Sequence, residues 1–118
     1  MQAVHWNDIP EDVLVDDIRR KIVTGTNVML GQIFFPEGAK VPAHRHESEQ
    51  ITNVITGSLL FIINGENIIV RTGQTLVIPP YVEHSAEALE ETYEIDTFSP
   101  IRTDWLDGTD IYIRGTES

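Results

Sequence analysis

The apolar residues of this chain fall in short runs rich in isoleucine, valine, phenylalanine and threonine, and most runs are closed by Gly, Pro or Asn. Such residues fit the pleated surface of a sheet, and runs of roughly four to eight of them are typical of strands. About eight strands with short turns indicate an all-β fold, either a small antiparallel barrel or a jelly roll. The predicted strands span residues 18–23, 28–35, 51–56, 58–64, 67–70, 75–79, 92–98 and 109–113.

Turn and helix signals add detail to this prediction. Asn64-Gly65 favours a tight hairpin between the runs on either side, because both residues accept the positive φ angles that a two-residue turn requires. Residues 10–12, beginning with Pro10, predict a short helical turn. Residues 103–108 predict another, with Thr103 as its cap and Gly108 at its end.

Length and charge restrict the function. A chain of 118 residues is expected to form one domain over residues 1–118. Its 19 acidic and 8 basic residues give a net charge of −11, which disfavours nucleic acid as a partner. The absence of cysteine excludes thiolate metal sites and disulfides. No segment has the pattern of a signal peptide or a membrane span, so we expect a cytoplasmic protein that does not contact a membrane.

Two histidines, His44 and His46, lie two positions apart, and Gln50 follows four residues later. Alternate side chains of a strand share a face, so these three side chains can point the same way, and even positions 50, 52 and 54 would face the interior. Imidazole is a common ligand of transition metals, and His84 could join from another strand. Two solvated surface histidines explain the pair equally well, so the pair alone leaves both interpretations open.

The wider spacing resembles the two-part signature of the cupin superfamily. Residues 38–57 read Gly, five residues, His, one, His, three, Gln, six, Gly, and residues 73–84 read Gly, five, Pro, four, His. The resemblance implies a conical β-barrel in which His44, His46 and His84 bind one divalent transition metal: Ni, Zn, Mn, Fe or Cu. Gln50 stands where the superfamily has a glutamate. A neutral amide leaves the metal a stronger Lewis acid, which favours polarising a substrate oxygen over oxygen chemistry.

Three longer stretches resemble the pectin-degradation, KdgF-like cupins, which open the ring of 4,5-unsaturated uronates to the linear keto form. These stretches are "HESEQITNVITG", "IPPYVEHSAEAL" and "YEIDTFSPIRTDWLDG". The resemblance implies a metal-dependent enzyme of the isomerase or lyase type that acts on a carboxylated sugar. It places Asp96, Phe98 and Arg102 at the active site, with Asp96 as the proton shuttle.

The residues themselves allow the same roles and also simpler ones. Asp96 and Phe98 share one face of a strand, and Arg102 has the forked geometry that binds a carboxylate. Alternatively, Asp96 bonds a nearby backbone amide, Phe98 is ordinary core and Arg102 forms a surface ion pair. Arg19 and Arg20 fall on opposite faces of an early strand, so only one of them can reach the interior.

Other function classes stay open at this level. A metal-dependent dioxygenase, another cupin lyase or isomerase, a non-catalytic small-molecule-binding protein and a structural cupin all use the same fold. Apolar residues on both faces of residues 28–35 and 92–98 predict that one sheet packs against a second copy, which gives a homodimer.

Overall fold

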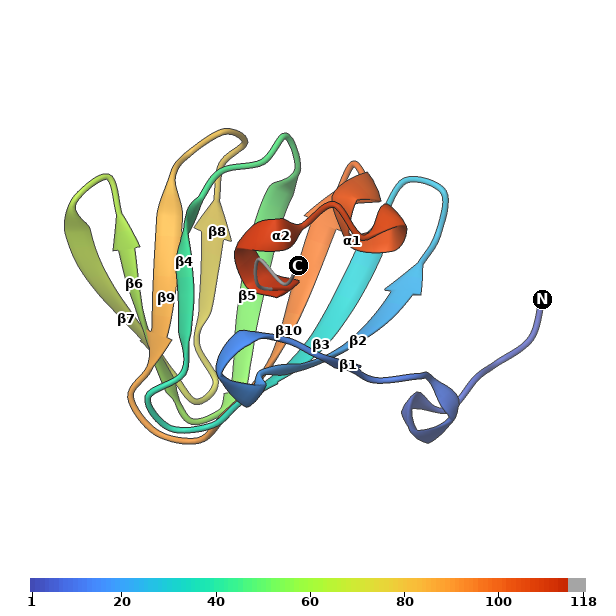
Figure 1. Ribbon diagram of the computed structural model, residues 1–118, viewed down its shortest axis with the longest axis horizontal. Coiled ribbons are helices and arrows are strands. Elements are labelled where there is room, and N and C mark those ends of the chain that lie inside the picture. The colour runs from blue at the N-terminus through green and yellow to red at the C-terminus, as the bar shows by residue number, and fades with distance from the viewer. Residues whose placement is uncertain (115–118) are drawn as a thin grey trace.

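The computed structural model describes residues 1–114, and it consists of two facing antiparallel sheets (Figure 1). One sheet has six strands in the order β1-β2-β3-β10-β5-β8, and the other has four in the order β4-β9-β6-β7. This arrangement confirms the predicted all-β jelly-roll class. The strands are β1 (Asp12–Val13), β2 (Arg19–Thr24), β3 (Met29–Phe35), β4 (Lys40–His44), β5 (Glu49–Thr56), β6 (Ser58–Ile63), β7 (Glu66–Arg71), β8 (Thr75–Ile78), β9 (His84–Ala88) and β10 (Thr92–Ser99).

Short helices flank the strands. Two 3-10 helices, η1 (Trp6–Asp8) and η2 (Val15–Asp17), lie near the start, and α1 (Thr103–Asp107) and α2 (Ile111–Arg114) follow the last strand. In Figure 1 the two α-helices lie across the space between the sheets, on the side that faces the viewer. None of the helices within residues 1–114 is long and apolar enough to span a membrane.

The alternation of β5 and β10 directs side chains into the space between the sheets. On β5, Gln50, Thr52 and Val54 are buried, as predicted from their even spacing. On β10, Asp96 and Phe98 are buried on one face. The two strands pair so that Gln50 lies opposite Phe98 and Thr52 opposite Asp96. The inward-facing side chains of β5 and β10 therefore lie next to one another between the two sheets.

The Asn64-Gly65 hairpin is confirmed: it joins β6 to β7 with φ angles of 50° and 81°. The first wrong expectation about local structure concerns residues 109–113. The residues predicted as a strand at 109–113 form the helix α2 instead, with Asp110 accepting backbone bonds from its last turn. A short apolar run does not by itself distinguish a strand from a helix.

The predicted helical turn at residues 10–12 is the second error. The turn lies earlier, at η1, where the His5 ring accepts a bond from the Asn7 amide, and Asp12 begins the strand β1. The turn at 103–108 is confirmed as α1. Gly108 ends it in the left-handed conformation, but Arg102 is the residue at its N-cap and Thr103 is its first residue.

Arg20 and Arg19 point to opposite faces, as predicted, and Arg20 is the one that is fully buried. Its Nη1 donates to the Asp110 carboxylate at 2.8 Å, and its Nη2 donates to Asp12 at 3.2 Å. Asp110 is also buried and accepts a bond from Arg114. This network attaches the C-terminal helices to the six-stranded sheet, because an uncompensated buried charge is strongly destabilising.

Candidate metal centre

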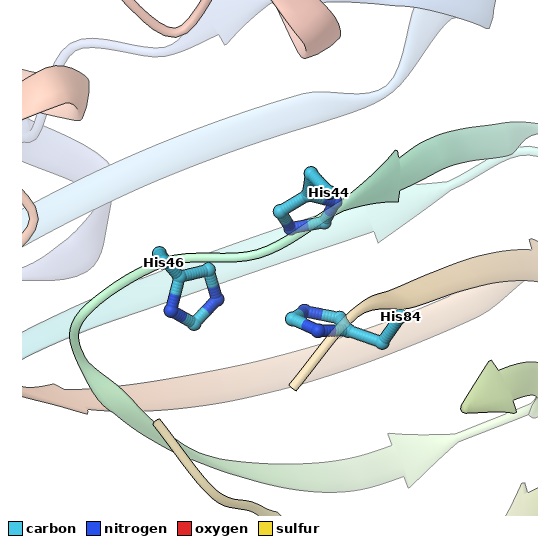
Figure 2. A group of neighbouring side chains, drawn as sticks. All are labelled: His44, His46 and His84. Carbon is cyan, nitrogen blue, oxygen red and sulfur yellow. The ribbon is translucent and has the colours of Figure 1, made fainter. Parts of the chain in front are cut away.

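Three histidines converge from different parts of the chain (Figure 2). His44 ends β4, His46 follows in the connection to β5, and His84 begins β9. The expectation that His44, His46 and Gln50 share one strand is therefore wrong, because the chain leaves one sheet after His44 and enters the other at Glu49. The antiparallel register places His44 directly opposite His84. One ligand atom from each ring lies within 4.8 Å of the others. Three imidazoles at this spacing can share one metal ion.

The hydrogen bonds of the rings show which nitrogen is free. In each of His44, His46 and His84, Nδ1 lies 2.9 Å from a backbone carbonyl two positions away. A carbonyl only accepts, so each Nδ1 carries the hydrogen and each Nε2 keeps a lone pair. Nε2 of His84 is buried without a hydrogen-bond partner within the described residues. Backbone carbonyls that fix the tautomer in this way are the usual supports of metal-ligating histidines.

The electrostatics of the cluster keep the rings neutral. Burial lowers the pKa of His44 from 6.5 to about 3, and the neighbouring His84 adds to the effect. Burial and the charge of Arg102 lower the pKa of His46 to about 4. Burial also lowers the pKa of His84. Neutral imidazole is the form that binds a metal, so the cluster is ready for ligation at neutral pH.

The orientation of Gln50 follows from a chain of hydrogen bonds. Its Nε2 donates to the Thr52 hydroxyl at 2.9 Å, and that hydroxyl donates to the Asp96 carboxylate at 2.7 Å. The amide oxygen therefore points at the histidines, 3.1 Å from Nε2 of His46. Both atoms are acceptors when His46 is the Nδ1-protonated tautomer. Two lone pairs facing each other are stabilised by a cation that both can ligate.

This donor set fits a divalent transition metal. His44, His46 and His84 could hold it through nitrogen, and Gln50 through its amide oxygen. Three imidazoles and an amide do not distinguish Ni, Zn, Mn, Fe and Cu. The structure brings together all four residues that the sequence nominated as ligands.

Asp96 lies deeper in the same cavity, which His44, Gln50 and His84 also line. Asp96 is 4% exposed, and burial raises the pKa of its carboxyl group. The Thr52 hydroxyl donates to its carboxylate at 2.7 Å, and the buried Glu94 carboxyl is also a hydrogen-bond partner, so side chains rather than a backbone amide hold Asp96. A carboxylate with a raised pKa, placed beside a metal site, is suited to moving protons.

Phe98 and Arg102 form one wall of the cavity. The Phe98 ring meets the His46 ring edge-on at 5.7 Å, and the Arg102 guanidinium lies 5.2 Å from the Phe98 centroid. Arg102 does form an ion pair, but it is buried rather than on the surface: its Nε and Nη2 bind both carboxylate oxygens of Asp104, at 3.0 and 2.8 Å. Phe98 serves as core and as cavity wall at once.

Among the cavity residues that the sequence analysis did not identify, three carry polar groups: Glu94, Trp105 and Tyr112. Burial raises the pKa of Glu94 well above its usual range, and the charge of Asp96 adds to this effect. The alternation that placed Asp96 and Phe98 inside also places Glu94 inside, so this residue could have been found. Trp105 and Tyr112 reach the cavity from α1 and α2, and no spacing in the sequence predicts that approach.

The fold and the site define a jelly-roll domain with a buried three-histidine cluster that could hold a metal. A family model described as a cupin domain matches residues 32–95, and the chain belongs to the cupin family. The pectin degradation protein KdgF of Dickeya dadantii (strain 3937) is 37% identical over 103 residues, which cover 85% of this chain and 94% of that protein.

Solved structures agree with this assignment. The structure of KdgF from Halomonas sp. matches with a TM-score of 0.78 and 32% identity, over 84% of this chain and 93% of the other. An RmlC-like cupin from Shewanella frigidimarina NCIMB 400 matches with a TM-score of 0.82 over 89% of this chain and 96% of the other. Its 24% identity supports the fold alone.

Proposed function

We propose that this cupin is a metal-dependent enzyme that opens the ring of 4,5-unsaturated uronates to the linear keto form. The observation that carries the proposal is the connection from the metal site to Asp96, which runs through Gln50 and the Thr52 hydroxyl in bonds of 2.9 and 2.7 Å. The relatives named for KdgF and for pectin degradation support the substrate class.

The reaction is an isomerisation that needs two proton movements. The anomeric hydroxyl loses a proton, its oxygen forms a carbonyl, and the bond from the anomeric carbon to the ring oxygen breaks. The ring oxygen leaves as the oxygen of an enolate, which takes up one proton on carbon and becomes a ketone, so no proton is gained or lost overall. A divalent metal held by His44, His46, Gln50 and His84 would supply Lewis acidity at a substrate oxygen.

Side chains of the protein would carry out the proton transfers and bind the substrate. Asp96 takes the hydroxyl proton and returns a proton to the enol carbon. Phe98 provides a flat apolar wall beside the sugar ring. Arg102, which Asp104 holds in a fixed plane, binds the substrate carboxylate. The cavity as it stands has a volume of about 40 Å³ and suits an ion with its waters.

The test combines elemental analysis with loss of the enol ether absorbance of an unsaturated uronate. The metal-loaded protein should consume the absorbance without taking up oxygen. Asp96→Asn should lower turnover by about 100-fold or more and leave the metal content unchanged. Asp8→Asn, at an exposed position on η1, is the matched control. Oxygen uptake would indicate a dioxygenase, and loss of metal from Asp96→Asn would make that residue structural.

The proposal includes a homodimer. The outer face of the six-stranded sheet carries apolar side chains among polar ones: the ladder register aligns Leu30, Thr97, Ile51 and Val77 in one row, with Phe34 on the same face. Ile51 and Phe34 are each 37% exposed, and Val77 is 52% exposed. A second copy of the chain would cover this face through a two-fold interface. The cytoplasmic location remains a prediction from the sequence.

A further inference from the structure

Tyr112 lies beside the metal cluster although it belongs to the last described helix. Its ring stacks on the His44 ring, with centroids 4.2 Å apart and planes inclined by 19°. The buried pair of Arg20 and Asp110 anchors α2 two residues before Tyr112. The position of Tyr112 is therefore set by an ion pair outside the cavity, and its ring reaches the cavity itself.

The hydroxyl group of Tyr112 has an unusual set of partners. Arg102 Nη2 lies 2.6 Å from the phenol oxygen, and Trp105 Nε1 lies 3.2 Å from it. Guanidinium and indole nitrogens only donate, so the oxygen accepts both bonds. Within residues 1–114 the hydroxyl's own hydrogen has no acceptor. A phenol keeps its hydrogen at neutral pH, so this group is an available donor.

One terminal nitrogen of the Arg102 guanidinium is available to bind a ligand. Nε and Nη2 bind Asp104, and Nη2 binds Tyr112 as well, whereas Nη1 makes no hydrogen bond within the described residues. Asp104 already neutralises the guanidinium charge, so an incoming carboxylate gains less from Arg102 than from an unpaired arginine. A second, neutral donor beside Nη1 would compensate for this loss.

We infer that Tyr112 is a specificity-determining residue that donates its phenolic hydrogen to the carboxylate of the substrate, next to Arg102 Nη1. This inference rests on the proposed function for the identity of the substrate, but its chemistry is that of uronate binding in general. Trp105 and Arg102 orient the phenol oxygen, and the stacking on His44 keeps the bound carboxylate close to the metal site.

The test measures binding apart from turnover. D-galacturonate carries the carboxylate but no enol ether, so it binds without reacting, and D-galactose is its counterpart without the charge. Tyr112→Phe keeps the stacked ring and removes the hydroxyl. In the zinc-loaded protein this variant should weaken galacturonate binding by about 10- to 100-fold, leave galactose binding and metal content unchanged, and raise KM with little change in kcat. Tyr93→Phe, on the outer face of β10, is the matched control.

Each outcome separates the two proposals. Equal galacturonate affinity in the wild type and Tyr112→Phe overturns the inference, as does an equal loss for both sugars, which would show a purely structural role. Absence of galacturonate binding by the wild type also overturns it. Carboxylate-dependent binding through Tyr112, without turnover of an unsaturated uronate, would uphold the inference and reject the proposed function.

Discussion

The metal-free protein should lose stability steeply as the pH falls below 6.5, because its histidine cluster resists protonation. An unfolded histidine titrates near 6.5, whereas burial lowers the pKa of His44 to about 3 and that of His46 to about 4. Between these values the unfolded state binds protons that the folded state excludes. The histidines' contribution to the free energy of unfolding is therefore fully present above pH 6.5 and is lost as the pH falls towards the folded-state pKa values.

The magnitude follows from linkage. One group contributes up to about 1.4 kcal/mol per pH unit, so a histidine with a pKa of about 3 removes about 2 kcal/mol between pH 6.5 and 4.5. His46 adds a similar amount, for a total of about 4 kcal/mol. The buried carboxyls oppose this trend, because the raised pKa values of Glu94 and Asp96 favour the folded state as the pH falls.

A comparison of variants isolates the histidine contribution. Urea unfolding of the metal-free protein is measured at pH 6.5, 5.5 and 4.5 for the wild type and for His44→Gln, which removes one titrating ring. The fall in unfolding free energy over this range should be about 2 kcal/mol smaller in His44→Gln. His5→Gln, at an exposed position outside the cluster, should follow the wild type. Parallel curves for the wild type and His44→Gln would refute the reasoning.

Three other predictions concern the metal and the assembly. Zinc at about 100 times its dissociation constant should stabilise the wild type by about 2.7 kcal/mol, measured by thermal melting. The stabilisation should be lost in His84→Ala and only reduced in Gln50→Ala, because water can replace an amide oxygen more readily than an imidazole. Thr52→Val should weaken zinc binding in a competition titration, because it removes the acceptor that orients the Gln50 amide; an unchanged affinity would show that Gln50 does not need this support. The wild type should sediment as the proposed dimer at micromolar concentration and Ile51→Glu as a monomer, and a wild type that sediments as 13.3 kDa would contradict the proposed interface.

Much of the site could be predicted because it depends on short-range periodicity. The alternation in β5 set Gln50 and Thr52 on the inner face, and the same rule in β10 set Asp96 and Phe98 there. The histidine spacing then matched a known ligand pattern. The inner-face positions on β5 and β10 need only a strand and its two faces, which the sequence shows locally, whereas the histidines were found from their spacing along the chain.

The remainder depends on partners far along the chain. β9 contains His84, two alanines and a glutamate and has little intrinsic strand preference; it is a strand because β4 and β6 pair with both of its edges. α2 has the composition of a strand, but its first turn is fixed by the contact between Asp110 and Arg20, 90 residues apart in sequence. Tyr112 reaches the cavity only through that contact, so local patterns could not have revealed it.

The ion pair between Arg20 and Asp110 also determines when the domain can be completed during synthesis. Every strand has been made by Ser99, yet the guanidinium inside the six-stranded sheet has its buried partner only once Asp110 follows. Until then Arg20 has the partly exposed Asp12 alone. Closing the interior before Asp110 has been synthesised would bury the Arg20 guanidinium without its buried partner, so the domain should complete its fold only after the segment that follows β10 has been made. A chain that ends after Ser99 would contain every strand of both sheets but would lack the carboxylate that neutralises the buried Arg20.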